Sequence, residues 1–426
     1  MKRTFTHYKF NKYSICTIGL ILLVFLYQLP IAVIFPKGIR QIGLFAALAC
    51  ILLTLFIHKS LKMIVLALLS GLISVCLYFT CWSIYPNYAD TGSLVSKTIQ
   101  YFLFWGYLFI GIIYQKAHQR QKKKVFVFWL FITIITMTTT LLGEIRFPGV
   151  ARLLAGIATE EESDFYKQYN IGSYNTVYGV LMALPVWCYL FKTSKKSQKI
   201  LSAFMIVYSL IFFILTEYAF AVVGAVVIML WYLFLSDNWN VWQFMKFSAA
   251  LLIFVLLLFS IEPILDYFIK YTITHDMGSF NRRLVAIKQL LQTGVQSDDI
   301  YKRNLHYNTS ITAFMQHPVL GGIIDLKNLK LGRHSELFDL MASLGLWGVF
   351  YLGYTLWYYY KKAIKPYKRD LCYRYMLIGV LCFLYLLVVN LVLNFHNVSF
   401  GLFILPILVF PYKRKKYNEI TEIIWR

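Results

Sequence analysis

Long apolar runs alternate with short polar segments along almost the whole chain. A helix needs about 17–25 mostly apolar residues to cross a bilayer, and many of the runs reach that length. The pattern therefore predicts an all-α membrane protein with about twelve spans. The predicted spans are 14–35, 41–57, 63–85, 98–115, 125–143, 174–191, 200–216, 218–235, 244–261, 340–360, 373–393 and 398–412.

The composition agrees with this interpretation and excludes a soluble protein. Hydrophobic residues make up 59% of the chain and charged residues only 14%, which is too little charge to cover the surface of a soluble protein of this length. The first apolar run, 14–35, is too long for the core of a signal peptide and has no small-residue cleavage site. We expect it to be retained as the first span of a single membrane domain covering 1–426.

The charge distribution predicts how the chain is oriented. The formal net charge is +23, and the excess falls on segments that share one side when the N-terminus is placed inside. We therefore expect a multi-pass protein of the cytoplasmic membrane with both termini in the cytoplasm. The basic runs are interpreted as anchors on the anionic lipids of the inner leaflet, and no nucleic-acid partner is expected. These runs are 121–125, 192–199, 361–369 and 413–416.

Two predicted outer segments are too long to be simple turns. The segment 144–173 is rich in acidic residues, and 262–339 joins the ninth and tenth spans. Within the second, the patterns at 280–293 and 300–317 are typical of amphipathic helices, the latter ending at Pro318. Loops of this length are uncommon unless they have a function, so we expect the site in 262–339.

The end of this loop, GRHSELFDLMASLGLWG (332–348), brings polar residues to the mouth of a span. If the helix begins near Ser335, the serine side chain can cap its first N–H groups, and His334 lies at the helix mouth. Glu336 and Asp339 are three residues apart, so both can face one interior cleft. Ionisable groups at membrane depth are costly and normally face a cavity or a partner.

The residue types in the loop predict phosphate chemistry without a metal. Arginine forks bind phosphate oxygens in pairs, and a histidine titrating near neutral pH can accept a proton from a hydroxyl. Neither H-x-x-x-H nor D-x-D spacing occurs on this side, so no metal ligand set and no cofactor are expected. Such a site suits attack by a hydroxyl on a carbon whose leaving group is a phosphate or diphosphate.

In order and position, three motifs of this region resemble the O-antigen ligase and polymerase family. They are the turn Pro318–Gly321, then His334, then the step Gly345-Leu346-Trp347-Gly348. The likeness is clearest over 280–350 and is supported elsewhere by the number of predicted spans. It implies a metal-independent membrane glycosyltransferase that moves a glycan from a polyprenyl diphosphate carrier to a hydroxyl group outside the cytoplasmic membrane.

The resemblance also implies roles for individual residues. His334 matches the general base, and Arg282 or Arg283 matches the arginine that holds the lipid diphosphate. Ligases of the family usually carry a Ser-Arg pair at the start of the eighth span, where this chain has Thr216-Glu217-Tyr218. A further set of candidates comes from the residues themselves: Arg303, Arg333 and Arg152 for the diphosphate, and Glu336 and Asp339 in supporting roles.

We therefore expect a polymerase that joins oligosaccharide repeat units of a capsule, exopolysaccharide or O-antigen. Its partners would be the polyprenyl diphosphate-linked oligosaccharide, membrane lipids, and flippase and chain-length regulator proteins. Two alternatives remain open within the same pathway, a ligase-type transfer to another acceptor and a lipid-linked oligosaccharide flippase. A flippase would spread charge through its span interiors, whereas this chain gathers charge in one long loop. A non-catalytic scaffold is a further alternative.

Overall fold

A computed structural model describes the chain over residues 12–36, 38–39, 42–43, 46–47, 49–50, 53, 104–154, 160–234, 262–274, 281, 284–285, 288, 298–323, 331–368, 370–393 and 395–410. All regular secondary structure in these ranges is helical. Five helices of the described part are long and apolar enough to cross a membrane. The expected all-α membrane class is thereby confirmed at this level. The five helices are Gln119–Arg146, Tyr174–Thr193, Lys196–Leu215, Glu336–Tyr367 and Leu371–Val389.

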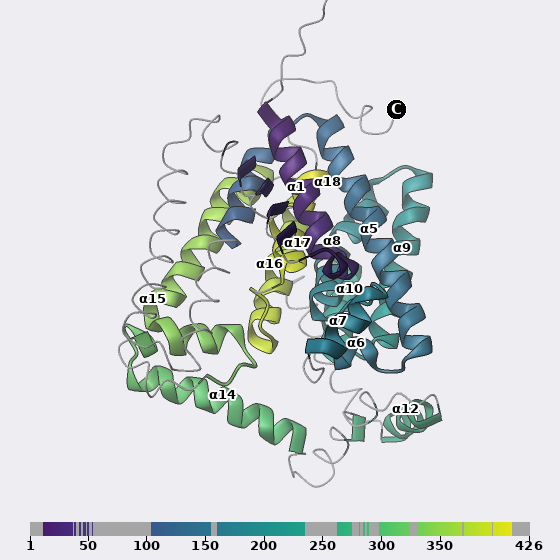
Figure 1. Cartoon of the computed structure of the whole chain (residues 1–426), viewed down its shortest axis with the longest axis vertical. Coiled ribbons are helices and arrows are strands. Elements are labelled where there is room, and N and C mark those ends of the chain that lie inside the picture. Colours follow the sequence, from purple (N-terminus) through teal and green to yellow (C-terminus); the bar gives the residue numbers. More distant parts are fainter. Residues whose placement is uncertain are drawn as a thin grey trace, which may run out of the picture.

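Figure 1 labels most of the described helices in chain order. Their bounds are α1 Lys12–Gln28, η1 Pro30–Ile34, α5 Gln119–Arg146, α6 Val150–Leu153, α7 Glu160–Gln168, α8 Tyr174–Thr193, α9 Lys196–Leu215, α10 Ala219–Phe234, α12 Glu262–Thr274, α14 Asp298–Gln316, η2 Gly321–Ile323, α15 Glu336–Tyr359, η3 Tyr360–Ile364, η4 Lys365–Tyr367, α16 Leu371–Val389, α17 His396–Phe403 and α18 Leu405–Val409. A further apolar helix covers Phe104–Tyr114.

Helix α8 forms the centre of the described bundle. Almost every side chain from Thr176 to Tyr189 is buried, and α8 contacts α5, α9, α10, α16, α17 and α18. A helix that is apolar on all sides is expected to be surrounded by other helices. In contrast, α9 buries only one face and leaves Ile200, Phe204 and Val207 exposed, as a helix at the lipid boundary does.

The predicted break between the seventh and eighth spans is confirmed. Helix α9 ends at Leu215 and α10 begins at Ala219. Glu217 between them has a φ of 57°, a left-handed conformation that continues no helix. The Thr216-Glu217-Tyr218 corner is therefore a sharp turn that brings the start of α10 to one end of the bundle.

Two predicted spans are shorter than expected because proline interrupts them. Helix α1 ends at Gln28, and Pro30 starts the 3-10 turn η1. The predicted span 398–412 is divided into α17 and α18, with Pro406 at the start of the second piece. Proline has no N–H to donate and its ring clashes with the preceding helical turn, so it favours a helix break at both places.

The helices α6, α7, α12 and α14 all lie at the lower end of the bundle in Figure 1, whereas α1 begins at the upper end. The described helices of the segments 144–173 and 262–339 therefore lie at the same end of the bundle. The helix predicted at 300–317 is confirmed as α14. The predicted spans 63–85 and 244–261, and most of 41–57 and of the helix at 280–293, lie outside the described residues.

Candidate functional site

Helix α14 presents a polar stripe to the start of α15. The stripe consists of Arg303, His306, Tyr307 and Ser310, which recur at the three- and four-residue spacing of one helix face. Helices α14 and α15 pack closely against each other, and the ring of Tyr307 lies edge-on to that of Phe338 in α15. The site is thus built where α14 crosses the start of α15.

A buried carboxylate ties the 332–334 segment to this stripe. The Ser310 hydroxyl donates a hydrogen bond to Asp339 Oδ1 at 2.6 Å and accepts one from the Gly332 N–H at 2.8 Å. The Arg333 N–H also donates to Asp339 Oδ1, at 3.3 Å. Asp339 is only 1% exposed, so these bonds compensate for the water that its carboxylate has lost. Asp339 thereby orders the turn that carries His334.

His334 lies beside His306 with part of its ring open to solvent. The two ring centroids are 4.3 Å apart and the planes meet at 64°. Gly332 makes this contact possible, because a Cβ at that position would lie 1.9 Å from the His306 carbonyl oxygen. The backbone of the turn therefore rests directly on α14, which leaves the His334 side chain at the surface of the site.

The surroundings favour the neutral form of His334. Loss of water on the packed side of the ring lowers the pKa of His334 below its ordinary value, and His306 and Arg303 lower it further. Asp339 acts in the opposite direction and raises it. A neutral imidazole has a nitrogen that can accept a proton, so the arrangement suits a general base.

Ser335 and Glu336 join the mouth of α15 to the end of α16. The Ser335 side chain accepts a hydrogen bond from the Phe338 N–H at 3.3 Å, so the predicted helix cap is confirmed. Glu336 is 1% exposed, its N–H donates to the Asn390 carbonyl, and its Oε2 accepts from the Leu393 N–H. Glu336 and Asp339 are thus both buried, but their hydrogen bonds lead to different elements.

Arg303 reaches from α14 to the far side of the site. Its guanidinium lies 4.5 Å from the centre of the Phe220 ring and donates to the Val389 carbonyl at 3.3 Å. Phe220 belongs to the first turn of α10, and Val389 is the last residue of α16. A cation on an aromatic face is held in a fixed direction, so Arg303 is oriented toward the start of α10.

Arg152 approaches the same corner from α6. The buried carboxylate of Glu144 accepts hydrogen bonds from the N–H groups of Gly149 and Ala151 at 2.7 and 2.8 Å, which fixes α6 to the end of α5. The Tyr218 hydroxyl donates to the Ala151 carbonyl at 2.7 Å, and the Arg152 charge acts on that hydroxyl. Two of the predicted arginines, 152 and 303, therefore flank the segment 216–220.

The turn Pro318–Gly321 and the step Gly345-Leu346-Trp347-Gly348 are in contact. Leu346 N–H donates to the Pro318 carbonyl at 2.8 Å, across the kink that Gly345 makes in α15 with a φ of 62°. A Cβ at Gly321, whose φ is 66°, would lie 2.4 Å from the Gly345 nitrogen. The turn after α14 therefore packs into the kink of α15. Both positions favour glycine, because residues with a side chain rarely adopt this positive-φ conformation.

The other predicted residues are placed apart from this cluster or are not described. Arg282 and Arg283 lie outside the described residues; Asn281 beside them donates to the Ile269 carbonyl of α12 at 3.1 Å. Two other histidines could have served as the base in place of His334. His396 stacks on Tyr27, and His275 lies outside the described residues. The His317 carbonyl accepts from the Gly321 N–H, so this residue forms the turn.

The sequence offered His306 only as a less favoured alternative to His334 as the base, and it did not single out Ser310. A signal for both was available, because they share a helix face with Arg303 and with each other. No such signal pointed to Asn390 or Phe220, since both lie far from α14 in the sequence. Among the described residues, no group of three or more His, Cys, Asp or Glu side chains is arranged to hold a metal ion.

No family model, curated protein or solved structure matches the chain.

Proposed function

We propose that this protein is a membrane glycosyltransferase of the polymerase type, using a polyprenyl diphosphate-linked oligosaccharide as donor. The observation that carries the proposal is the position of His334, solvent-exposed at the mouth of α15 and ordered by Asp339. The proposal includes about twelve spans with both termini in the cytoplasm. The site then lies on the outer side of the cytoplasmic membrane, where flipped repeat units are available.

In this mechanism the His334 ring takes the proton from a hydroxyl of the acceptor sugar. The hydroxyl oxygen forms a bond to the anomeric carbon of the donor chain while the bond from that carbon to the diphosphate oxygen breaks. The configuration at the anomeric carbon inverts. The electron pair leaves on the polyprenyl diphosphate, and arginine forks stabilise the departing negative charge.

Arg303 and Arg152 are the described arginines best placed for the diphosphate. Arg303 stacks on Phe220, and Arg152 follows Ala151, whose carbonyl accepts a hydrogen bond from Tyr218 at the start of the predicted eighth span. Family ligases carry an arginine in that segment itself, and this chain does not. Arginines supplied by other helices support diphosphate binding beside the segment 216–220. The absence of an arginine within that segment favours a polymerase over a ligase. Arg282, Arg283 and Arg333 remain additional candidates.

The test is His334→Ala in a strain that makes the glycan. We expect loss of long chains with accumulation of single repeat units, because removing a general base slows proton transfer by about 10² to 10⁴. The matched control is His317→Ala, since the hydrogen bond of His317 to the turn uses its backbone carbonyl. Normal long chains in His334→Ala at normal protein level would contradict the proposal.

The same experiment separates the alternatives. Long chains left on the carrier lipid would indicate a ligase. Lipid-linked units trapped on the inner leaflet would indicate a flippase. If the protein is a non-catalytic scaffold, polymer should be lost only when the protein is absent, and His334→Ala should leave the polymer unchanged.

A further inference from the structure

Helix α15 carries a stripe of exposed apolar side chains along one face. The members of the stripe recur every three or four residues, which is the spacing of one helix face: Trp347, Phe350, Tyr354 and Trp357. Phe350 is 67% exposed. Because α15 belongs to a segment long and apolar enough to cross a membrane, large apolar side chains that point out of it face lipid.

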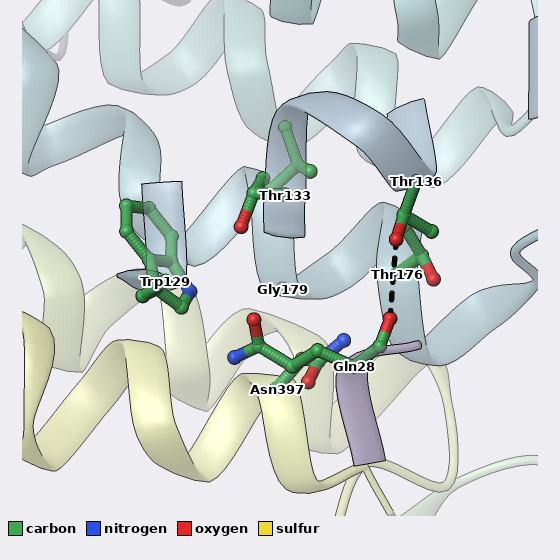
Figure 2. A pocket seen from close by; sticks show the side chains of 8 residues that line it. Gln28, Trp129, Thr133, Thr136, Thr176, Gly179 and Asn397 are labelled. Carbon is green, nitrogen blue, oxygen red and sulfur yellow. Dashed lines mark hydrogen bonds between the residues drawn. The ribbon is translucent and has the colours of Figure 1, made fainter. Parts of the chain in front are cut away.

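The polar cavity inside the bundle is too small for lipid. Figure 2 shows this cavity between α1, α5, α8 and α17, with a lining that includes Gln28, Thr133 and Asn397. The centre of a water molecule can move in only about 10 Å³ of it, which is room for one water at most. At this place lipid chains therefore meet the described helices only on their outer faces.

The apolar surface of α15 continues onto the turn after α14. The Leu346 N–H donates to the Pro318 carbonyl at 2.8 Å, so the turn and the helix touch. Exposed apolar side chains follow both residues in the chain, and a further one, Met315, is 70% exposed in the last turn of α14. This surface is called the apolar edge and consists of Ile311, Met315, Val319, Leu320, Leu346 and Trp347.

A polar ridge runs along α14 beside the apolar edge. Its members are exposed and recur every four residues, as the side chains of one helix ridge do: Asn304, Asn308, Thr312 and Gln316. Residues 304–324 include no Asp, Glu, Lys or Arg. An uncharged helix with an apolar and a polar side is suited to the boundary between hydrocarbon and lipid headgroups, because no charge has to leave water there.

The thickness of a bilayer extends as far as the apolar edge. At the other end of the α15 stripe, the Lys361 ammonium lies 4.7 Å from the centre of the Trp357 ring, and such pairs are typical of a membrane–water interface. The helix rises only about 21 Å between Lys361 and Trp347, and any tilt shortens this height. A hydrocarbon core about 30 Å thick therefore continues beyond Trp347 to the turn after α14.

We propose that the apolar edge is inserted into the lipid leaflet at the α14 end of the bundle, while the polar ridge faces headgroups and water. Removal of the exposed apolar side chains from water drives this insertion. Because α14 also contacts the turn that carries His334, lipid holds the candidate site at the depth of the headgroups. The proposal concerns lipid contact alone and does not depend on the proposed transferase activity.

The variants Met315→Cys and Gln316→Cys form a matched pair for a test. Both side chains are exposed at neighbouring positions of α14, one on the apolar edge and one on the polar ridge. The full-length proteins are placed in nanodiscs of phosphatidylethanolamine and phosphatidylglycerol and treated with a charged maleimide, with the unaltered protein as the background for the native cysteines. We expect Met315→Cys to react several-fold more slowly, because the reagent stays in water and apolar surroundings disfavour the thiolate. Equal rates would overturn the proposal.

A phospholipid with a photoactivated diazirine on its acyl chain identifies what covers the apolar edge. In the same nanodiscs we expect the label in residues 315–320 at a yield close to that in 347–350, as read by mass spectrometry. Slow reaction of Met315→Cys without lipid label in 315–320 would mean that protein covers the edge, and would overturn the proposal. The His334→Ala protein should be labelled like the unaltered protein, so failure of the proposed function and failure of lipid contact can be told apart.

Discussion

The rings of His306 and His334 meet edge to face with their centroids 4.3 Å apart. One belongs to α14 and the other to the turn before α15, so the contact joins a helix of the long loop to the mouth of a membrane helix. Two imidazoles at this distance do not readily carry positive charge together. His306 therefore acts directly on the pKa of the residue proposed as the base, and it lowers that pKa.

Replacing His306 by Gln should move the acidic limb of the pH profile for glycan transfer to higher pH. The base works when neutral, so the rate falls as the pH drops through the pKa of His334. His306 lowers that pKa, so its removal raises the pKa and moves the limb upward. The side chains that act on the pKa of His334 are His306 and Arg303 of α14 and Asp339 of α15, and Arg333 is its neighbour in the chain.

The measurement is the initial rate of transfer from lipid-linked oligosaccharide in membrane vesicles between about pH 5 and 8, where histidine titrates. His317→Gln is the control and should leave the limb in place. A rate that falls by the same factor at every pH would indicate a purely structural role for His306.

Asp339→Asn should move the same limb in the opposite direction. The Asp339 carboxylate raises the pKa of His334, so a neutral amide lets that pKa fall and the limb moves to lower pH. An asparagine oxygen can still accept from the Ser310 hydroxyl and the Arg333 N–H, so the turn should persist. The same vesicle assay, run beside the unaltered protein, checks the sign. A shift upward would contradict the electrostatic assignment.

Gly332→Ala should destabilise the site by about 1–3 kcal/mol, the usual cost of overpacking. The added Cβ would lie 1.9 Å from the His306 carbonyl, which is backbone and cannot rotate away. Gly353→Ala in α15 is the matched control, because its Cβ would meet nothing within 4 Å. Alanine there should be neutral or stabilise the helix by up to about 1 kcal/mol. Thermal unfolding of both variants in detergent measures the difference, and equal midpoints would contradict the close approach.

Arg303→Lys should weaken donor binding more than it slows turnover. Lysine keeps the charge but loses the planar fork and the stacking over Phe220. We expect the KM for the lipid-linked donor to rise several-fold while kcat changes less, and Arg303→Ala to reduce kcat/KM further. Asn304→Ala, at an exposed position of the same helix, is the control. Kinetic constants unchanged in Arg303→Ala would exclude Arg303 from the diphosphate site.

The helical class and the positions of the long apolar helices named below were predictable from the sequence, because they depend on local properties. An apolar segment that satisfies its backbone hydrogen bonds internally can cross a membrane wherever its neighbours lie. For this reason the predicted spans at 125–143, 174–191, 200–216, 218–235, 340–360 and 373–393 correspond to described helices. The Ser335 cap is likewise a contact between residues three apart.

The partners within the site were decided only by tertiary structure. Ser310 lies 29 residues before Asp339, and Arg303 lies 86 residues before Val389. Contacts over such separations depend on how helices cross and pack, which no periodicity along one segment encodes. The sequence alone therefore placed His334 at a helix mouth and at one end of the bundle. Only the packing of α14 against α15 brought His306, Ser310 and Arg303 around it.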